Sequence, residues 1–307
     1  NKLMIQTVNN LIHHLKVNTK KVSRMAICGN PFQLSLFQNI EIRDLAYAGR
    51  NVWETLKFTP PKRDGDVISA KELGLDLCSD AQVFIPPAVG HEIGADALAM
   101  LLLTGAMEES EPCIVIDYGT NAEMALVSGG HIYTGSAAAG PALEGQEVRM
   151  GMLAAPGAIS DIDLSEGEWS CSVLDKGFAP KTGDTIDPLN GRVTTRGPMH
   201  SQAKGITGTG VIATIAGGIK NGLITPQKIL TGDNKVHLQD GIYLDENDIS
   251  EAGKAIGAIR AGYMTLITNA GLKPEDVKTA FMSGATGVYV DAKKAQGIGL
   301  VPPCAER

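Results

Sequence analysis

The sequence predicts an α/β protein of roughly two domains, and three observations carry this prediction. Short apolar stretches alternate with stretches in which apolar residues recur at helical spacing, which is typical of layered α/β units. The chain has 36 glycines among 307 residues, as expected where many strands and helices are joined by tight turns. The charged stretch around Glu108, Glu109 and Glu111 separates two such patterns. At about 150 residues per domain, we place one domain at residues 1–108 and the other at 109–307.

The first half has a helix–strand–helix–strand–helix order. Proline suits the first turn of a helix, so a helix is expected to begin at Pro31. The expected elements are a helix over 5–15, a strand over 22–27, a helix from Pro31, a strand over 83–85 and an almost wholly apolar helix over 95–103. Two strands are too few for a whole sheet domain, and we interpret this half as partial.

The second half begins with a β-meander. Strands are expected over 113–116, 122–127 and 131–133, followed by a polar, turn-rich excursion or lid over about 156–204. Alternation of Trp169, Cys171 and Val173 indicates that this insert is rich in β-structure. Helices should follow the glycine-rich turn at 205–210 and run from Asp248 to about 271, and a last strand should cover 277–282. Asp248 with Glu251 predicts a capping box.

Charge and apolar patterning argue against several classes of protein. The net charge is −7, and no basic stripe with interleaved aromatics indicates nucleic-acid binding. The longest uncharged apolar stretch, 97–107, is too short to span a bilayer, and no signal-peptide pattern is present, so a cytoplasmic protein is expected. The chain starts at Asn1 rather than Met, and we expect a processed product, a fragment or part of a longer protein.

The five cysteines are scattered and form no Cys-x-x-Cys pair. They predict neither a zinc site nor an iron–sulfur cluster in this chain. Each is expected to be a free, buried thiol that packs as a small apolar side chain.

The strongest local signal is the turn that follows the strand ending at Ile116. Asp117 is delivered to the mouth of a hairpin, where it suits a metal-bound water beside phosphates. Gly119 allows close approach of a ligand to the backbone, and the amides of the turn, with Thr120 and Asn121, suit phosphate oxygens. A plain hairpin is an equally open interpretation, because Asp and Gly are common in turns.

Three further glycine-rich turns follow at element boundaries. They comprise 135–145 with Gly140 and Glu144, then 205–210 with Gly205, Gly208, Thr209 and Gly210, then 283–287 with Ser283, Gly284 and Gly287. The spacing in 205–210 is not the dinucleotide fingerprint, and no Gly-Lys-Ser/Thr of a P-loop occurs. Dispersed histidines and the lack of a Gly-x-Ser-x-Gly elbow argue against a serine hydrolase. Each turn alone is more often structural.

Taken in order, these motifs resemble a known family. The stretches 117–123, 140–145, 205–210, 283–287 and 299–302 resemble the C-terminal ATPase domain of reductive activators of corrinoid proteins. Residues 27–37 and 43–47 look most like the activases of methylamine methyltransferase corrinoid proteins. The resemblance covers about residues 8–302.

The resemblance implies a fold of two ribonuclease-H-like subdomains that clasp ATP–Mg²⁺, as in the actin, sugar-kinase and Hsp70 superfamily. It implies that 117–123 is the second phosphate hairpin, that 283–287 faces the adenosine, and that 140–145 and 205–210 line the cleft. The first subdomain would be truncated, because the family's first phosphate hairpin, expected before 5–15, is missing. Ala285 also stands where the family usually has a second glycine.

The function implied is ATP-dependent return of a Co(II) corrinoid protein to Co(I) for methyl transfer, as in methylamine methanogenesis. Asp117 and Glu123 would position the metal-bound or attacking water, with Asp117 at the Mg²⁺. The implied partners are a corrinoid methyl-transfer protein and a low-potential electron donor. Iron–sulfur clusters are expected beyond Arg307, and the isolated chain is expected to be inactive.

Two other functions remain open on the residues alone. One is a small-molecule kinase of the same superfamily with Asp161, Asp163 or Asp184 as its base. The other is a nucleotide-gated interaction module that closes on a partner without turnover.

Overall fold

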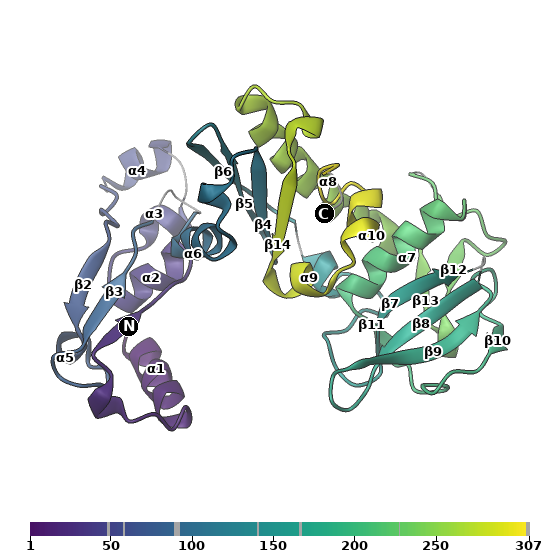
Figure 1. Cartoon of the computed structure of the whole chain (residues 1–307), viewed down its shortest axis with the longest axis horizontal. Helices are drawn as coiled ribbons and strands as arrows, with labels where there is room; N and C mark the ends of the chain where they lie inside the picture. Colours follow the sequence, from purple (N-terminus) through teal and green to yellow (C-terminus); the bar gives the residue numbers. More distant parts are fainter. Residues whose placement is uncertain are drawn as a thin grey trace. The chain divides into compact units, whose positions relative to one another are not determined.

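The computed structural model describes residues 1–47, 50–57, 59–88, 93–139, 141–165, 168–226 and 228–304. The chain divides into two compact units, Asn1–Gly105 and Ala106–Arg307 (Figure 1). Each unit encloses its own cluster of buried apolar side chains. No helix among the described residues combines the length and apolar character that crossing a membrane requires.

In the unit Asn1–Gly105, helices pack against a small mixed sheet whose central strand, β3, alternates exposed and buried residues. The strand order is β1-β3-β2, with β1 parallel and β2 antiparallel to β3. Its core joins Ile5 and Phe37 of two helices to Val83 and Ile85 of β3. The elements are α1 (Lys2–His14), η1 (Thr19–Lys21), β1 (Arg24–Ala26), α2 (Pro31–Gln38), α3 (Arg43–Ala46), α4 (Arg50–Leu56), β2 (Asp66–Ser69), α5 (Ala70–Leu73), β3 (Gln82–Ile85) and α6 (Ala95–Thr104).

The prediction that a helix begins at Pro31 is confirmed. Pro31 occupies the first turn, and the Asn30 and Gln33 side chains form a reciprocal capping box at the N-terminus. The third strand, β2, was not expected. Its Val67 side chain is 54 % exposed, so the strand lacks the apolar run that marks a buried strand.

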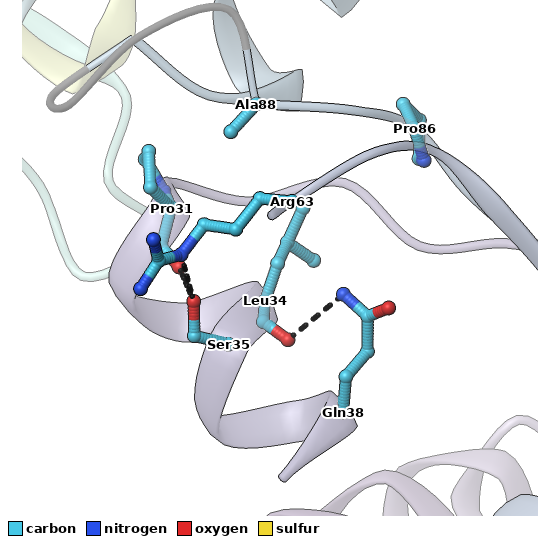
Figure 2. Close-up of a pocket in the computed structure, with 7 residues that line it drawn as sticks. All are labelled: Pro31, Leu34, Ser35, Gln38, Arg63, Pro86 and Ala88. Atoms are coloured by element: carbon cyan, nitrogen blue, oxygen red, sulfur yellow. Dashed lines mark hydrogen bonds between the residues drawn. The ribbon is translucent and has the colours of Figure 1, made fainter. Parts of the chain in front are cut away.

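A half-buried arginine, Arg63, holds α2 and α3 to the chain before β2. The Arg63 guanidinium makes two hydrogen bonds of 2.7 and 2.9 Å to the Asp44 carboxylate, and its Nε donates to Ser35 Oγ at 2.7 Å. Figure 2 shows Arg63 lying over α2 with its Nε directed at Ser35. A hollow of about 10 Å³ beside these residues has room for about one water.

Burial alone would raise the pKa of Asp44, but the hydrogen bonds and charge of Arg63 outweigh it and hold that pKa below its ordinary value. The carboxylate is therefore ionised and paired although it is only 3 % exposed.

The unit Ala106–Arg307 contains two larger sheets. Its first sheet has the order β14-β4-β5-β6, in which β14 is parallel to β4 and the other pairs are antiparallel. The elements up to the second sheet are η2 (Ala106–Glu108), β4 (Cys113–Tyr118), β5 (Ala122–Ser128), β6 (His131–Ala137) and η3 (Pro141–Glu144). The meander expected here is confirmed, although β4 continues through Asp117 to Tyr118 and β6 is longer than expected.

The segment expected as an excursion or lid has a different role. It is rich in β-structure, as predicted, but its strands form most of a five-stranded sheet with the order β10-β9-β8-β7-β11. Trp169, Cys171 and Val173 are at most 1 % exposed and belong to the core of the unit. Helix α7 packs along β7, as Figure 1 shows. The alternation that the sequence displays therefore marks a core sheet rather than a mobile cover.

The remaining elements connect and flank the two sheets. They are β7 (Ala158–Ser165), β8 (Glu168–Leu174), β9 (Pro180–Ile186), β10 (Val193–Thr195), β11 (Gly205–Ile206), α7 (Gly208–Lys220), β12 (Lys235–His237), η4 (Gln239–Gly241), β13 (Tyr243–Asp245), α8 (Glu246–Asn269), η5 (Pro274–Asp276), β14 (Thr279–Ser283), α9 (Gly284–Tyr289) and α10 (Ala292–Gly297).

The predicted cap of the long helix was one turn too late. Asp245 is the N-cap of α8, accepting from the backbone N–H groups of Asn247 and Asp248, and the Asp248 side chain completes the capping box. Asp245 is also the last residue of β13, so the strand passes directly into the helix. Glu251 instead pairs with Lys254 on the helix surface.

Candidate functional site

Strand register assembles a polar row at one end of the first sheet. Asp117 of β4 lies directly beside Ser283 of β14 on one side and Glu123 of β5 on the other, and Glu123 pairs with Ser136 of β6. Residues in direct register share a face. The row Ser283–Asp117–Glu123–Ser136 therefore runs across four strands on one face. Ser136 belongs to the predicted turn 135–145 but was not singled out as a site residue.

The opposite face of the same sheet is apolar and covered. Ile116 and Met124, one residue from Asp117 and Glu123, are at most 1 % exposed, and α8 packs against β5 and β6 on their side. The alternation of a strand thus places Asp117 and Glu123 on the face opposite α8, at the end of the sheet beyond the buried Val115 and Ala125. Two carboxylates directly opposite each other repel unless a proton or cation lies between them.

The turn between β4 and β5 contains only residues 119–121. The Gly119 N–H donates to the Asn121 carbonyl at 3.1 Å, so this amide is engaged in the turn itself. A Cβ added at Gly119 would meet only that carbonyl oxygen, at 3.5 Å. Contacts within the described chain therefore do not require glycine here, and the space beside its Cα is open.

Thr120 joins this turn to η3. Its hydroxyl donates to Glu144 Oε2 at 3.1 Å, and the Gln146 amide reaches the same oxygen at 3.3 Å. The structure thus brings together Thr120 and Glu144, which belong to separate sequence motifs.

Two helix N-termini approach the same neighbourhood closely. Gly284 begins α9 with φ +79°, and an added Cβ would collide with the Asp117 carboxylate and lie 2.7 Å from the Tyr118 carbonyl oxygen. Gly208 begins α7 against the Leu143 carbonyl, with the Glu144 N–H 3.2 Å from its added Cβ. Thr286, a buried residue not predicted for the site, donates to Leu143 O at 3.2 Å. The predicted segment 283–287 is a helix start rather than an open turn.

The other predicted glycines of the site face their own chain. Gly205 lies against Met150 and Met152, Gly210 against the Ile159 carbonyl, and Gly287 against the Tyr118 ring. The Thr209 hydroxyl donates to Ser160 O at 2.8 Å. Gly140 lies outside the described residues.

Backbone carbonyl oxygens of the motif at 299–302 accept hydrogen bonds from two tyrosine hydroxyls. Tyr118 donates to Leu300 O at 3.1 Å and Tyr263 to Gly299 O at 2.9 Å. Burial raises the pKa of both phenols above the ordinary value, so both remain neutral donors at physiological pH. This motif therefore fastens the chain after α10 to β4 and α8.

Of the three aspartates considered as the base of a kinase, two are held by hydrogen bonds or an ion pair and the third is exposed. Asp184 is fully buried, where it accepts from Gly197 N–H at 2.9 Å and contacts His200 Nδ1 at 2.8 Å. Asp161 forms an ion pair with Lys294 at 2.6 Å, and Asp163 is exposed on β7. Asp184 and Asp161 are therefore structural carboxylates, and Asp163 is a surface carboxylate.

The five cysteines are free, but not all are buried. Cys113 and Cys171 are buried, and desolvation raises their pKa values to about 11 and about 12, respectively. Cys28 is exposed at the end of β1, so the expectation of a buried thiol is wrong there. The strand ends before Cys28 and leaves it outside the core.

Comparison with known proteins connects this geometry to a family. Residues 111–307 match the family model described as the C-terminal domain of RACo, the ASKHA domain, and residues 1–109 match the RACo middle region. The chain is 48 % identical over 307 residues to the [Co(II) methylated amine-specific corrinoid protein] reductase of Methanosarcina barkeri, covering 100 % of this chain and 56 % of the relative.

More distant relatives agree. The corrinoid activation enzyme RamQ of Eubacterium limosum is 28 % identical, over 97 % of this chain and 49 % of its own length. The solved structure of a reductive activator for corrinoid, iron–sulfur protein superposes with a TM-score of 0.70 at 26 % identity, covering 97 % of this chain and 46 % of that chain. The chain spans about half the length of the curated relatives it matches.

These matches confirm the ribonuclease-H-like α/β fold that the resemblance implied, and they favour an activator over a small-molecule kinase. With its polar row and adjoining helix starts held in the matched ASKHA domain, the chain belongs to the RACo family of reductive activators of corrinoid proteins.

Proposed function

We propose that this chain is the nucleotide-binding core of an ATP-dependent activator that returns a Co(II) corrinoid protein to Co(I). Support comes from the relatives, whose names describe a reductase of a methylated-amine-specific corrinoid protein, a corrinoid activation enzyme and a reductive activator. The partners are a corrinoid methyl-transfer protein of methylamine metabolism and a low-potential electron donor. The iron–sulfur clusters belong to another part of the parent protein, which acts in the cytoplasm.

The observation that carries this proposal is the register that aligns Ser283, Asp117 and Glu123 beside the open turn at Gly119. Two neighbouring carboxyl groups next to an unobstructed backbone turn would suit a divalent cation that accompanies a phosphate group. Mg²⁺ is usually held by one or two carboxylates, with waters and phosphates completing its shell. The described residues hold no group of three or more His, Cys, Asp or Glu side chains that would bind a metal by themselves, and Mg²⁺ does not need one.

Each residue of the site then has a distinct role. Asp117 would hold Mg²⁺ through a water molecule, and Glu123 would orient the attacking water from the neighbouring strand. Thr120 turns its hydroxyl from Glu144 toward a phosphate oxygen, and the Asn121 amide donates from the end of the turn. Gly284 lets α9 start against Asp117, where Ser283 and Gly287 complete the adenosine side.

The remaining glycine motifs support the site from outside the hairpin. Gly208 brings the start of α7 against η3, which carries Glu144, and Gly205, Thr209 and Gly210 fix that helix to β7. Gly140 precedes η3. A helix start aimed at phosphate oxygens supplies N–H donors and the positive end of the helix dipole.

We propose residues 1–108 as part of the first ribonuclease-H-like subdomain and residues 109–307 as the second. Nucleotide drives activation only if the conformations of the activator differ in nucleotide affinity. ATP and ADP should therefore bind the parent protein with different affinity in the presence and absence of the corrinoid partner.

Calorimetric titration of the protein with Mg²⁺–ATP tests the proposed nucleotide site. Asp117→Asn and Thr120→Val should each weaken binding by about tenfold or more, equivalent to about 1.4 kcal/mol. Asp163→Asn removes an exposed carboxylate from β7 and serves as the matched control, which should bind as the unaltered protein does. In EDTA, the difference between Asp117→Asn and the unaltered protein should disappear.

The activity itself is measured in the full-length parent with its corrinoid partner, by the absorbance change from Co(II) to Co(I). Asp117→Asn should abolish ATP-dependent reduction and leave ATP-independent reduction unchanged. Failure of the unaltered parent to bind either ATP or ADP would refute the proposal.

A further inference from the structure

A groove of about 590 Å³ lies within the unit Ala106–Arg307, away from the polar row. The second half of α7, the first half of α8 and the chain around the Ile224–Ile229 bridge form its sides. None of the residues proposed to bind nucleotide lines it. Its volume lies within the range of about 300–1,000 Å³ found for small-molecule sites.

Isoleucines line this groove. Ile215, Ile224 and Ile229 are at most 5 % exposed and form its floor, whereas Ile219 is 46 % exposed and forms part of the wall. Such a lining favours an apolar ligand body, which gains about 25 cal/mol for each Å² removed from water.

Two glycines of α8 leave the groove open. Gly253 and Gly257 are one helical turn apart, and both line the groove. A Cβ added at either position would meet no described atom within 4 Å. Each glycine costs the helix about 1 kcal/mol relative to alanine, and no close packing contact within the described chain explains that cost.

The rim of the groove is basic although the whole chain is acidic. Lys228, Lys254 and Arg260 line it together with one carboxylate, Glu246, in a chain of net charge −7. Glu246 Oε1 faces the Ile229 N–H at 3.4 Å, and Lys254 pairs with Glu251 at 2.6 Å. For the Lys228 ammonium and the Ser250 hydroxyl, no hydrogen bond is found within the described part of the chain.

We propose that this groove binds a small amphipathic anion, with an apolar body on the isoleucines and one carboxylate, sulfonate or phosphate group between Lys228 and Arg260. The ligand is a free small molecule. The site is separate from the nucleotide site, and it stands whether or not the nucleotide assignment does.

Calorimetric titration of residues 1–307 with 1-anilinonaphthalene-8-sulfonate tests the proposal. Its uncharged counterpart, N-phenyl-1-naphthylamine, has the same ring system without the sulfonate. Gly257→Leu fills the groove and should weaken sulfonate binding by about tenfold or more, equivalent to about 1.4 kcal/mol. Gly257→Ala should give a smaller loss. Gly232→Leu is the matched control, because Gly232 also has open space around its Cα but does not line the groove.

The charged rim is tested by Lys228→Gln and Arg260→Gln. Each should weaken binding of the sulfonate several-fold and leave binding of the uncharged compound unchanged. Retention of the unaltered melting temperature shows that the fold is intact, and Gly257→Ala remains a usable test if the leucine variant unfolds.

Three outcomes would overturn the proposal. The first is sulfonate affinity that Gly257→Leu and Gly257→Ala leave unchanged. The second is equal affinity for both compounds with no effect of Lys228→Gln or Arg260→Gln, which would indicate an apolar docking face for a protein segment. The third is competitive displacement of the sulfonate by Mg²⁺–ATP, which would make the groove part of the nucleotide site.

Discussion

Gly119 and Gly284 lie on either side of Asp117 but are needed for different reasons. Gly119→Ala adds a methyl group into open space, so the free energy of unfolding should change by less than about 0.5 kcal/mol. The same methyl group obstructs the approach of phosphate to the turn, and Mg²⁺–ATP affinity should fall by about tenfold or more. Chemical denaturation and calorimetric titration of one variant measure the two effects separately.

Gly284→Ala is the contrasting variant. Gly284 has φ +79°, and its Cβ would strike the Asp117 carboxylate and the backbone of Tyr118. The free energy of unfolding should fall by more than about 1 kcal/mol, because both the backbone conformation and the space exclude a side chain. Equal stability of the two alanine variants would contradict this distinction.

The pair Arg63–Asp44 should dominate the stability of its unit. Arg63→Met leaves a buried carboxylate without its main partner and should cost about 3–5 kcal/mol of unfolding free energy. The double variant Arg63→Met/Asp44→Leu removes both charges and should recover most of this loss. Denaturation of the single and double variants checks this, and similar losses in both would argue against the pair.

The same pair predicts a dependence on pH. The pKa of Asp44 is lowered in the folded protein, so the unfolded chain binds more protons at this group. Its stabilisation is present above the ordinary carboxyl pKa of about 3.9 and is lost as the pH falls through the folded value. The difference in unfolding free energy between the unaltered protein and Asp44→Asn should therefore narrow from pH 7 toward pH 3.

Helix α8 provides a direct test of where a helix begins. Asp245→Ala removes the side chain that accepts from two backbone N–H groups and should cost about 1 kcal/mol. Glu251→Ala, at the position that the sequence alone favoured as part of the cap, loses only a surface pair with Lys254 and should cost less than about 0.5 kcal/mol. Thermal denaturation of both variants discriminates between the two starts, and the reverse order of losses would contradict the observed cap.

The sequence predicted those helices and strands whose formation depends on residues that are close in the chain. The helix start at Pro31, the apolar run of β4 and the long periodic pattern of α8 depend on neighbours within a few residues. The role of β7–β10 was misjudged because the polar residues of these strands outnumber the apolar alternation that faces the core. The individual residues of the polar row were predicted, but their alignment in one row was not. Asp117 and Ser283 are far apart in the sequence, and their pairing depends on the register of strands in the folded sheet.

The two units should unfold separately. Among the described residues, one core cluster lies within Asn1–Gly105 and another lies within Ala106–Arg307. Residues 106–307 alone should therefore fold and melt cooperatively, at a temperature close to that of one of two transitions in the whole chain. Differential scanning calorimetry of both proteins checks this, and a single shared transition in the whole chain would contradict it.

The placement of the two tryptophans gives each core its own optical reporter. Trp169 is fully buried in the five-stranded sheet, where its indole N–H has no hydrogen-bond partner among the described residues. Trp53, in the other unit, is half-buried and donates to the Tyr47 carbonyl at 2.9 Å. Because an indole in dry surroundings emits at shorter wavelength than a hydrated one, Trp169 supplies the blue edge of the emission spectrum. Replacing Trp53 by Phe then leaves a fluorophore that reports only on the ASKHA domain.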